Sequence, residues 1–552
     1  MTKANVAYVP VEDVTVEGAR RSEGELIGFQ EIKCHLIFDV KMDFTRKARF
    51  VAGGHTTETP ASLTYSSVVS RESVRIAFFL GALHGLDVMS CDIGNAYLNA
   101  KCREKIWFKA GPECGENAGK VCKLVRALYG LRSSGAAWRD MFSNFIKEVL
   151  DFTPTTMDPD VYIRKSFKTG SGEAYYEYLL VYVDDILVFS EKPSAVMEKI
   201  GEHFTLKDGF AEPDTFLGAG LTKKSFPTEG GATSLWTMDS AKYVANAVKT
   251  VESLLDEDGR VLKGKSFKTK QHSSPLDVDY KPELESTPIC DDELASRYRQ
   301  LIGILRWAVE LGRIDILHEV SLLSQYQAGP RTGHLEAVYC IFYYLKHNPV
   351  RRVVFDAARI VHQGKFNDGA DWAAFYGDLE EEAPLNAPEP LGEAVKLTCF
   401  VDANHAGNVV TRRSHTGVII LLGITPIVAF SKRQNTVETA TFGSEFVAMR
   451  IARDLIVGLC LKLMSFGVKL DGPADVHCDN MGVCKNTMIP ESTLSKKHNA
   501  INYHAVREAV ARGLMRVCKE DTKTNIADAL TKLMSYAHKD QLLCEYLGLM
   551  RN

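Results

Sequence analysis

The sequence predicts a mixed α+β protein built from more than one domain, and three observations support that prediction. A chain of 552 residues is too long for a single hydrophobic core, so roughly two to four domains are expected. From about Ile32 to about Lys223, apolar strand-like runs alternate with helical segments, which is the pattern of an α+β domain. The stretch from Glu393 to Asn552 is about the size of one compact α/β domain.

The composition is that of an ordinary soluble globular protein, with 45% hydrophobic and 25% charged residues. The net charge of −4 excludes a strongly basic tail, but it is compatible with a local basic groove for nucleic acid. The 13 cysteines include no C-x-x-C pair, which argues against a zinc ribbon and a dense disulfide scaffold. Met1–Arg21 lacks an apolar signal core, and no apolar stretch is long enough for a membrane span. A cytoplasmic or nuclear protein that is not secreted is therefore expected.

In chain order, residues 1–28 show little periodicity and are predicted to be a leader or linker. Residues 29–250 hold the alternating pattern. Residues 251–366 begin with a polar stretch, Leu255–Glu285, predicted to be a loop, and continue with helical periodicity from Glu293 to Lys346. The runs that define the alternation are Cys34–Val40, Val68–Gly85, Leu86–Cys91, Tyr175–Phe189 and the helix-like Ala136–Leu150.

The C-terminal part begins after an acidic, proline-rich segment, residues 367–392, which is predicted to be a second linker. Residues 393–552 follow as the α/β domain. Its predicted elements are strands at Val395–Val401, Thr416–Leu422 and Ala474–Cys478, and helices after Gly443 and after Asn502.

Two adjacent carboxylates, Asp184 and Asp185, interrupt the apolar run Leu179–Phe189. Because burying unpaired charge is costly, the pair must face water, a cation or a turn, and a hairpin turn is the simple alternative. Asp92 ends another apolar run, where a helix cap or a turn is the simple alternative. If the two strands are neighbours, the three carboxylates converge and repel one another unless divalent cations lie between them. Oxygen ligands suit Mg²⁺, and a pair of such ions serves in-line phosphoryl transfer.

A second set of carboxylates lies in the last domain. Asp402 follows a strand, Glu445 begins a helix, Asp479 ends a later strand, and Asp528 lies in the final helical segment. Individually each has an ordinary explanation as a turn residue or a partner of a helix N-terminus. Together they could hold two Mg²⁺ ions that activate a water and stabilise the leaving oxygen of a phosphodiester.

Collinear strings resemble the reverse transcriptase and ribonuclease H region of copia/Ty-type retrotransposon Pol polyproteins. Tyr182-Val-Asp-Asp185 is similar to the Y-x-D-D hairpin of reverse transcriptases, Ser90–Asn99 resembles the motif with their first aspartate, and the four later carboxylates follow the order of an RNase H-like nuclease. The resemblance implies a right-hand polymerase of fingers, palm and thumb, followed by an RNase H-like α/β domain. Other similar strings are Lys47–Gly54, Tyr65–Val69, Leu128–Trp138, Phe216–Gly218, Tyr298–Gly303, Leu322–Ser324, Arg412–Gly417, Phe430–Gln434, Glu491–Leu494 and Tyr503–Glu508.

The resemblance also implies roles for single residues. The seven carboxylates would bind Mg²⁺, or Mn²⁺ in its place, with two ions per site. Tyr97 would crowd a ribose 2′-OH and favour deoxynucleotides; the simpler alternative is that Tyr97 is a tyrosine of the hydrophobic core. Lys47 and Arg49 would contact the incoming triphosphate; the alternative is a solvated strand edge. The residues expected to contact substrate are Lys47, Arg49, Tyr97, Gly130, Tyr182 and Arg413, and Lys432 and Arg433 are further candidates for phosphate contacts.

Three departures from the resembled pattern stand out. Ser133 and Gly135 occupy positions where copia-type sequences commonly show Gln and Pro, which puts nucleotide handling in doubt more than activity. No histidine of the kind that many such nucleases place before their last aspartate is evident before Asp528; His498 and His504 are candidates only by position.

The function implied is RNA-directed DNA synthesis with degradation of the RNA strand, by the C-terminal part of a copia-like polyprotein. Its partners would be an RNA template, a DNA or tRNA-like primer, the RNA–DNA hybrid and dNTPs, without a membrane, in a cytoplasmic virus-like particle or after nuclear entry. Whether the chain is a monomer or a homodimer stays open. Two alternatives also stay open: a catalytically silent or domesticated nucleic-acid-binding remnant, and a nuclease whose polymerase half is scaffold only.

Overall fold

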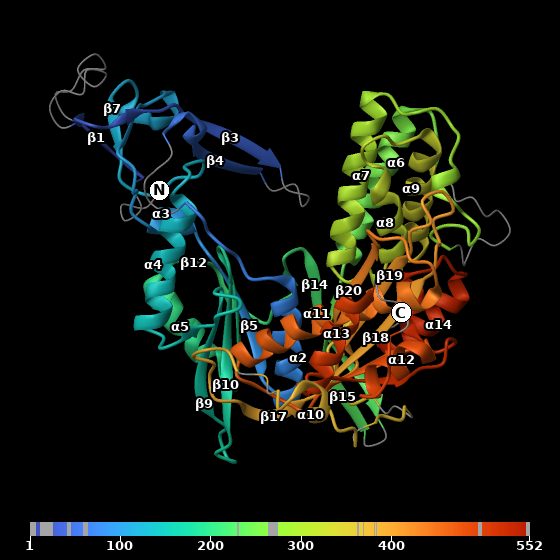
Figure 1. Ribbon diagram of the computed structural model, residues 1–552. Helices are drawn as coiled ribbons and strands as arrows, with labels where there is room; N and C mark the ends of the chain where they lie inside the picture. The colour runs from blue at the N-terminus through green and yellow to red at the C-terminus, as the bar shows by residue number, and fades with distance from the viewer. Residues whose placement is uncertain are drawn as a thin grey trace. The chain divides into compact units, whose positions relative to one another are not determined.

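The computed structural model describes residues 7–11, 26–40, 46–58, 64–228, 231–262, 274–360, 364–367, 369–379, 381, 383–494 and 499–547. By its internal contacts the chain divides into two compact units, and both contain helices and sheets (Figure 1), so the predicted mixed α+β class is confirmed. Unit 1 comprises Met1–Val69, Asp87–Lys165 and Glu177–Glu212, and unit 2 comprises Ser70–Leu86, Ser166–Tyr176 and Pro213–Asn552.

A six-stranded sheet, most of whose residues belong to unit 1, has the order β12-β5-β11-β10-β9-β8. The predicted run Tyr175–Phe189 folds as the hairpin of β10 and β11, because Val183 and Asp184 form a tight turn between them. The run Leu86–Cys91 lies almost entirely in β5, which pairs antiparallel with β11. The strands are β5 (Asp87–Ile93), β8 (Thr153–Pro154), β9 (Val161–Phe167), β10 (Ala174–Tyr182), β11 (Asp185–Ser190) and β12 (Leu206–Ala211).

Two helices of unit 1 share a core with this sheet. Helix α4 (Ser134–Glu148) confirms the helix-like run predicted there, and α5 (Pro193–His203) contacts β5, β11 and β12. Trp138 and Phe142 of α4 stack on each other and pack with strand residues such as Ile186 in one buried cluster. Since each such side chain contributes about 1.5–3 kcal/mol on burial, the cluster firmly supports the end of the sheet that carries the aspartates.

The rest of unit 1 is a hairpin and a smaller sheet. The predicted strand Cys34–Val40 is β3, which pairs with β4 (Arg46–Ala52). The smaller sheet has the order β1-β7-β6-β2, so part of the predicted leader is built into a sheet. Its strands are β1 (Tyr8–Pro10), β2 (Gln30–Glu31), β6 (Ile106–Lys109) and β7 (Val121–Leu124), and the short helices are η3 (Gly54–Thr56), α3 (Ala96–Asn99) and η4 (Pro112–Asn117).

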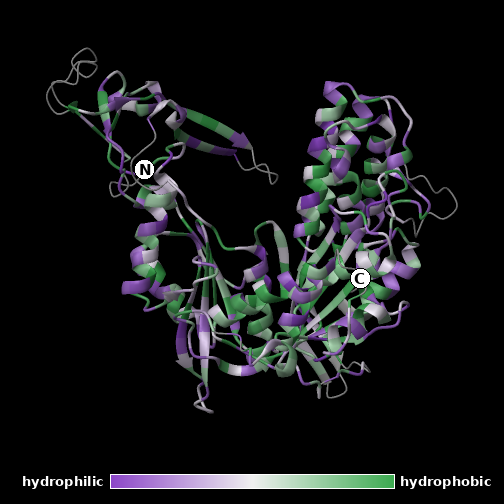
Figure 2. Ribbon diagram, in the orientation of Figure 1, coloured by the Kyte–Doolittle hydropathy of each residue, from purple (hydrophilic) through white to green (hydrophobic). Residues whose placement is uncertain are grey.

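Unit 2 contains a five-stranded sheet in the order β20-β19-β18-β22-β23. β18 pairs antiparallel with β19 and parallel with β22, so residues 393–552 contain a mixed sheet, as is expected of an α/β domain. β18 and β19 are almost fully buried, and hydrophobic residues (green in Figure 2) dominate them. The strands are β18 (Leu397–Asn404), β19 (His415–Leu422), β20 (Thr425–Arg433), β22 (Ala474–Cys478) and β23 (Met515–Lys519), and the helices are α11 (Thr441–Ser465), α12 (Met481–Met488), α13 (Ala500–Ala511), η9 (Ile526–Leu530) and α14 (Tyr536–Leu547).

A helical bundle and a four-stranded sheet make up much of the remainder of unit 2. Helices α6 to α9 pack around a common core (Figure 1), and α7, α8 and α9 cover the segment predicted to be helical. The helices are α6 (Ala241–Glu257), α7 (Asp292–Glu310), α8 (Leu317–Leu323) and α9 (Thr332–His347), with η5 (Pro282–Leu284), η6 (Ile314–Ile316) and η7 (Ser324–Tyr326). The strands, in the order β13-β14-β15-β16, are β13 (Thr215–Phe216), β14 (Ala219–Thr228), β15 (Gly231–Asp239) and β16 (Arg352–Val354).

The apolar run Val68–Gly85 folds as helix α2 (Arg71–His84), which belongs to unit 2. Its ends are set by the sequence: the Ser70 hydroxyl accepts the Ser73 amide at 3.2 Å, and Gly85 closes the helix at a φ of 58°. Within unit 2, α2 packs on β15 and β20, and the Arg75 guanidinium donates to the Glu310 carbonyl at 2.8 Å.

The predicted linker at residues 367–392 and the predicted loop Leu255–Glu285 contain some regular structure. The acidic segment 367–392 includes α10 (Ala373–Tyr376) and ends in β17 (Leu391–Val395), which pairs with β21 (Val468–Leu470). The predicted loop Leu255–Glu285 begins in the last turn of α6, and its residues 263–273 lie outside the described part of the chain. The domain boundaries remain predictions. Among the described residues, no helix has the length and apolar character needed to cross a membrane.

Candidate metal centres

The three aspartates of unit 1 meet at the end of the six-stranded sheet. Asp185 of β11 is the direct cross-strand partner of Asp92 on β5, and Asp184 is the turn residue just before Asp185. Side chains directly opposite in an antiparallel pair have Cβ atoms about 4.5–5.5 Å apart. The fold therefore brings together carboxylates that are more than ninety residues apart in sequence, as the sequence predicts.

A strained turn holds these aspartates. Val183 has a φ of 60°, a region that β-branched residues rarely adopt. The Trp138 indole donates to the Val183 carbonyl at 2.7 Å, and the Ile93 amide donates to the Asp184 carbonyl at 2.9 Å. These two bonds fix the turn to α4 on one side and to β5 on the other.

Burial and mutual repulsion make this cluster reluctant to ionise. Burial, and then the charges of Asp184 and Asp92, raise the pKa of Asp185 to about 6, and burial also raises the pKa of Asp184. A cation already balances part of the negative charge of this cluster, because the Lys207 ammonium donates to Asp92 Oδ2 at 2.8 Å. A partly buried set of hard oxygen donors, two of them with raised pKa values, fits a divalent cation.

Tyr97 and Tyr182 lie beside this cluster. The Tyr97 ring is 4.8 Å from the Tyr129 ring, and burial and nearby Asp184 raise the pKa of Tyr97. Tyr182 pairs with Asp185 across the turn. A Cβ added at Gly135 would lie 3.3 Å from Ser66 Cβ and 4.0 Å from Tyr97 Oη, so a larger side chain at this position would crowd Ser66 and contact the Tyr97 hydroxyl.

The remaining predicted contacts of unit 1 lie on β4 and the loop before α4. Lys47 is near enough to Asp184 to lower its pKa, opposing the effect of burial, whereas Arg49 lies 3.8 Å from Asp39 in a half-exposed ion pair. Gly130 has a φ of 94°, and a Cβ there would meet the Ala52 carbonyl at 2.0 Å, so this glycine permits close packing of the protein's own backbone. The unexpected Ser133 is buried and donates to Glu104 at 2.5 Å.

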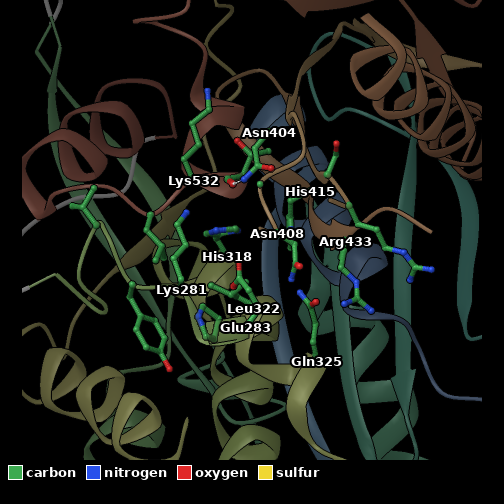
Figure 3. A pocket seen from close by; sticks show the side chains of 18 residues that line it. Lys281, Glu283, His318, Leu322, Gln325, Asn404, Asn408, His415, Arg433 and Lys532 are labelled. Carbon is green, nitrogen blue, oxygen red and sulfur yellow. Dashed lines mark hydrogen bonds between the residues drawn. The ribbon is translucent and has the colours of Figure 1, made fainter. Parts of the chain in front are cut away.

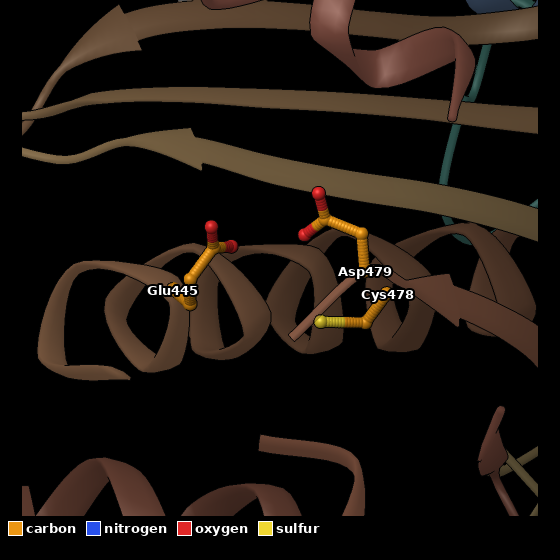
Figure 4. A group of neighbouring side chains, drawn as sticks. All are labelled: Glu445, Cys478 and Asp479. Carbon is orange, nitrogen blue, oxygen red and sulfur yellow. The ribbon is translucent and has the colours of Figure 1, made fainter. Parts of the chain in front are cut away.

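The four later carboxylates form a second cluster within unit 2. Oxygens of Asp402, Asp479 and Asp528 all lie within 4.8 Å of one another. Glu445 joins through Asp479, because an oxygen of each and the Cys478 sulfur also lie within 4.8 Å of one another (Figure 4). A hydrogen bond with Cys484 and burial raise the pKa of the Cys478 thiol well above its usual value.

Local packing explains this convergence. Asp402 on β18 pairs with Gly417 on β19, and a Cβ at Gly417 would approach the Ala527 carbonyl and Thr531 Cγ2 to 2.8 Å. The glycine therefore lets η9 lie directly on the sheet, which brings Asp528 to Asp402. The side-chain amide of Asn525 reinforces this contact by donating to the Val401 carbonyl at 3.0 Å.

The electrostatics of the second cluster resemble those of the first. Burial and the charge of Asp528 raise the pKa of Asp402 to about 6. Burial, Asp402 and Asp479 raise the pKa of Glu445 well above its usual value, and Glu445 Oε2 is buried without a hydrogen-bond partner among the described residues. A buried acceptor of this kind, facing other carboxylates, fits a divalent cation.

Two lysines at the clusters were not anticipated. Lys532 Nζ lies 2.8 Å from Asp528 and 3.6 Å from Asp402, much as Lys207 lies at Asp92. The sequence offered a signal for Lys532, because it follows Asp528 by four residues in a segment predicted to be helical, although η9 ends at Leu530. Lys207 had none, because only the pairing of β12 with β5 brings it to Asp92.

The histidines can also be placed. His504 bonds with the Tyr376 hydroxyl at 3.0 Å, and His498 lies outside the described residues. His405 was not anticipated. It forms a hydrogen bond with the Ser444 hydroxyl at 3.2 Å, next to Glu445. The sequence feature that could have indicated it is its position three residues after Asp402.

Residues 26–253, which include all three aspartates of unit 1, match the family model described as reverse transcriptase (RNA-dependent DNA polymerase). Over most of its length the chain is similar to the Pol region of copia/Ty1-type retrotransposons. It is 26% identical over 496 residues to the retrovirus-related Pol polyprotein from transposon RE1 of Arabidopsis thaliana, covering 89% of this chain and 29% of that protein. It is 26% identical over 541 residues to that from transposon TNT 1-94 of Nicotiana tabacum, covering 95% and 36%.

A yeast relative and two solved structures complete the comparison. The transposon Ty1-NL2 Gag-Pol polyprotein of Saccharomyces cerevisiae is 23% identical over 508 residues, which cover 91% of this chain and 26% of that protein. The chain thus spans between 26% and 36% of the length of these three relatives. The N-terminal RNase H domain of rv2228c from Mycobacterium tuberculosis, solved as a maltose-binding-protein fusion, matches 28% of this chain and 99% of that chain, with 13% identity and a TM-score of 0.20. LC11-RNase H1 in complex with an RNA/DNA hybrid matches 25% and 94%, with 15% identity and a TM-score of 0.21.

Proposed function

We propose that the chain is an RNA-directed DNA polymerase with a ribonuclease H activity, acting at two separate carboxylate clusters. The observation that carries this proposal is the convergence of Asp92, Asp184 and Asp185 in unit 1 and of Asp402, Glu445, Asp479 and Asp528 in unit 2. The match of residues 26–253 to the reverse transcriptase model supports the first activity.

In unit 1, Asp92, Asp184 and Asp185 would hold Mg²⁺ or Mn²⁺, which supplies activation of the attacking oxygen and charge neutralisation at the phosphate. Lys47 lies close enough to Asp184 to hold the negative charge of a triphosphate there. Tyr97, packed on Tyr129, presents a rigid ring that would exclude a ribose 2′-OH. Tyr182 and the Trp138–Val183 bond position the aspartates.

In unit 2, Asp402, Glu445, Asp479 and Asp528 would hold the same ions, and the substrate would be the RNA strand of an RNA–DNA hybrid. The Ala403 amide bonds to the Glu445 carboxylate and Thr522 donates to Asp479 at 3.1 Å, so both carboxylates keep a fixed orientation. Asp402 accepts a hydrogen bond from the Thr531 hydroxyl. Carboxylates held in a fixed orientation can keep the ions and the reacting groups correctly placed, which accelerates the reaction.

Primer extension on a poly(rA)·oligo(dT) template with Mg²⁺ tests the polymerase activity, and cleavage of a labelled RNA–DNA hybrid tests the nuclease. Asp185→Asn should abolish synthesis and leave cleavage intact, whereas Glu445→Gln should do the reverse, so each variant is the other's control. A wild-type chain that neither extends a primer nor cleaves a hybrid would instead be a silent nucleic-acid-binding remnant. Cleavage without synthesis would mean that unit 1 serves as scaffold only.

A further inference from the structure

A cavity of about 160 Å³ in unit 2 is lined by cations that the proposed chemistry does not use. Figure 3 shows the side chains around it, which come from η5 and the segment before it, from α8 and η7, from the loop between β18 and β19, and from the ends of β18, β20 and η9. One water needs roughly 10–15 Å³, so the cavity has room for a polyatomic anion with its hydration water.

The charges around this cavity are unbalanced. Lys281, Arg413 and Arg433 line it, and none of the three has an ion-pair partner among the described residues. The carboxylate of Glu283 is the opposing charge, and it is already engaged by the Val409 amide at 2.9 Å. Besides Lys532, which is paired with Asp528, three cations line the cavity and face one carboxylate, so the net positive charge favours an anionic ligand. Two of the three are arginines, whose planar guanidinium groups match phosphate oxygens.

The cavity has rigid walls. His415 bonds to the Ser431 hydroxyl at 2.8 Å, and that hydroxyl donates to the Leu530 carbonyl at 2.7 Å. The His318 ring packs edge-on against His415 at 4.7 Å, which ties α8 to the sheet. Burial lowers the pKa of His415 to about 3, so these histidines form a neutral wall.

The cavity lies beside the carboxylate cluster of unit 2, and this position indicates which anion it binds. Its lining includes Asn404 and Lys532, and Lys532 contacts both Asp528 and Asp402 of the carboxylate cluster. Asn404 Oδ1 and Gln325 Oε1 are buried acceptors without a partner among the described residues, so the ligand must also bring donors, such as a sugar hydroxyl or bound water. A nucleic-acid backbone that passes the cluster offers both.

We propose that this cavity, bounded by Lys281, Arg413 and Arg433, holds a backbone phosphate of the RNA–DNA hybrid next to the phosphate that is cleaved. The proposal rests on the proposed nuclease function and adds to it a substrate contact from Lys281, which lies outside the nuclease domain predicted from the sequence. Residues before η5 thereby contribute to hybrid binding.

Fluorescence anisotropy with a labelled RNA–DNA hybrid tests this assignment, in an Asp402→Asn background so that binding is measured without cleavage. Lys281→Ala, Arg413→Ala and Arg433→Ala should each weaken binding about five- to tenfold at 0.1 M salt and lower the log–log salt slope by about one. Lys469→Ala removes an exposed lysine of the same unit that does not line the cavity, and it should change neither quantity.

Further measurements distinguish a backbone phosphate from free phosphate, and a loss of binding from a loss of folding. Inorganic phosphate should compete with the hybrid in the parent protein and not in the triple alanine variant. Unchanged hybrid affinity in the three variants would overturn the assignment. So would variants that lose binding of inorganic phosphate but keep binding of the hybrid, because the cavity would then be a site for a free anion.

Arg413→Lys and Arg433→Lys keep the positive charge and should retain the salt slope. If they lose it as the alanine variants do, the effect is one of packing and the assignment fails. A wild-type chain that binds as expected but does not cleave would overturn the nuclease proposal and leave the phosphate site standing.

Discussion

At the scale of single residues, the ion pair between Lys207 and Asp92 competes with a metal ion for the same carboxylate. Lys207→Met keeps much of the side chain's length and removes the charge. A charge a few ångströms away at a half-exposed site is worth on the order of 1 kcal/mol, so the Mg²⁺ concentration for half-maximal synthesis should fall about fivefold. Mg²⁺ titrations of primer extension near pH 8 measure this, well above the pKa of about 6 of Asp185. A higher Mg²⁺ requirement in the variant would show that Lys207 assists the reaction.

Asp402 predicts a pH dependence of stability. Its pKa is raised in the folded protein to about 6 from an ordinary value of 3.8, so the folded state binds the proton more tightly than the unfolded state. The resulting stabilisation is fully present below about pH 4 and is lost as pH rises through about 6, in total on the order of 3 kcal/mol without divalent cations. Thermal unfolding in EDTA between pH 4 and pH 7 should show this decline, and Asp402→Asn should flatten it. An equally steep decline in the variant would assign the effect to other groups.

At the scale of elements, Gly417 decides where η9 lies. A Cβ at this position would push against the Ala527 carbonyl and shift Asp528. Because small misplacements of a reacting group can reduce rates about 100-fold, Gly417→Ala should reduce hybrid cleavage by roughly that factor. Primer extension is the internal control and should be unchanged. Full cleavage activity would mean that η9 adapts without moving Asp528.

Elements with one buried face, or with both faces buried, were predictable from the sequence. Ala474–Cys478 is buried along its whole length and forms a strand with the predicted bounds. Cys34–Val40 also forms a strand with the predicted bounds, although most of its described residues are exposed. The hairpin of β14 and β15 was not predicted, since residues such as Lys223, Lys224 and Ser225 give it no continuous apolar run. Its stability comes from cross-strand pairs, which depend on register and not on local pattern.

The two carboxylate clusters were predictable as sets of residues, whereas their cationic partners were not. Carboxylates inside apolar runs stand out locally, as Asp184 does in β10–β11. Lys207 stands in a polar strand beside a bulge, and nothing near it in sequence distinguishes it from a solvent-exposed lysine.

At the scale of the whole molecule, the two clusters belong to different compact units and share no carboxylate. Effects at sites without shared partners are usually additive. Mn²⁺ binding should therefore be lost in two independent steps: Asp92→Asn with Asp185→Asn removes one set of ions, and Asp402→Asn with Glu445→Gln removes the other. Calorimetric titration of the two double variants and of the quadruple variant measures this, and strongly non-additive losses would show that the clusters communicate.

Helix α2 has a practical consequence for dissecting the chain. It is encoded between stretches of unit 1, yet it covers β15 and β20 of unit 2. A truncated gene that starts at Pro213 would thus lack this helix, and the hydrophobic surfaces beneath it would meet water. Such a fragment should aggregate unless a separate peptide spanning Ser70–Leu86 is co-expressed, so the two activities are better separated by point substitutions than by cutting the chain.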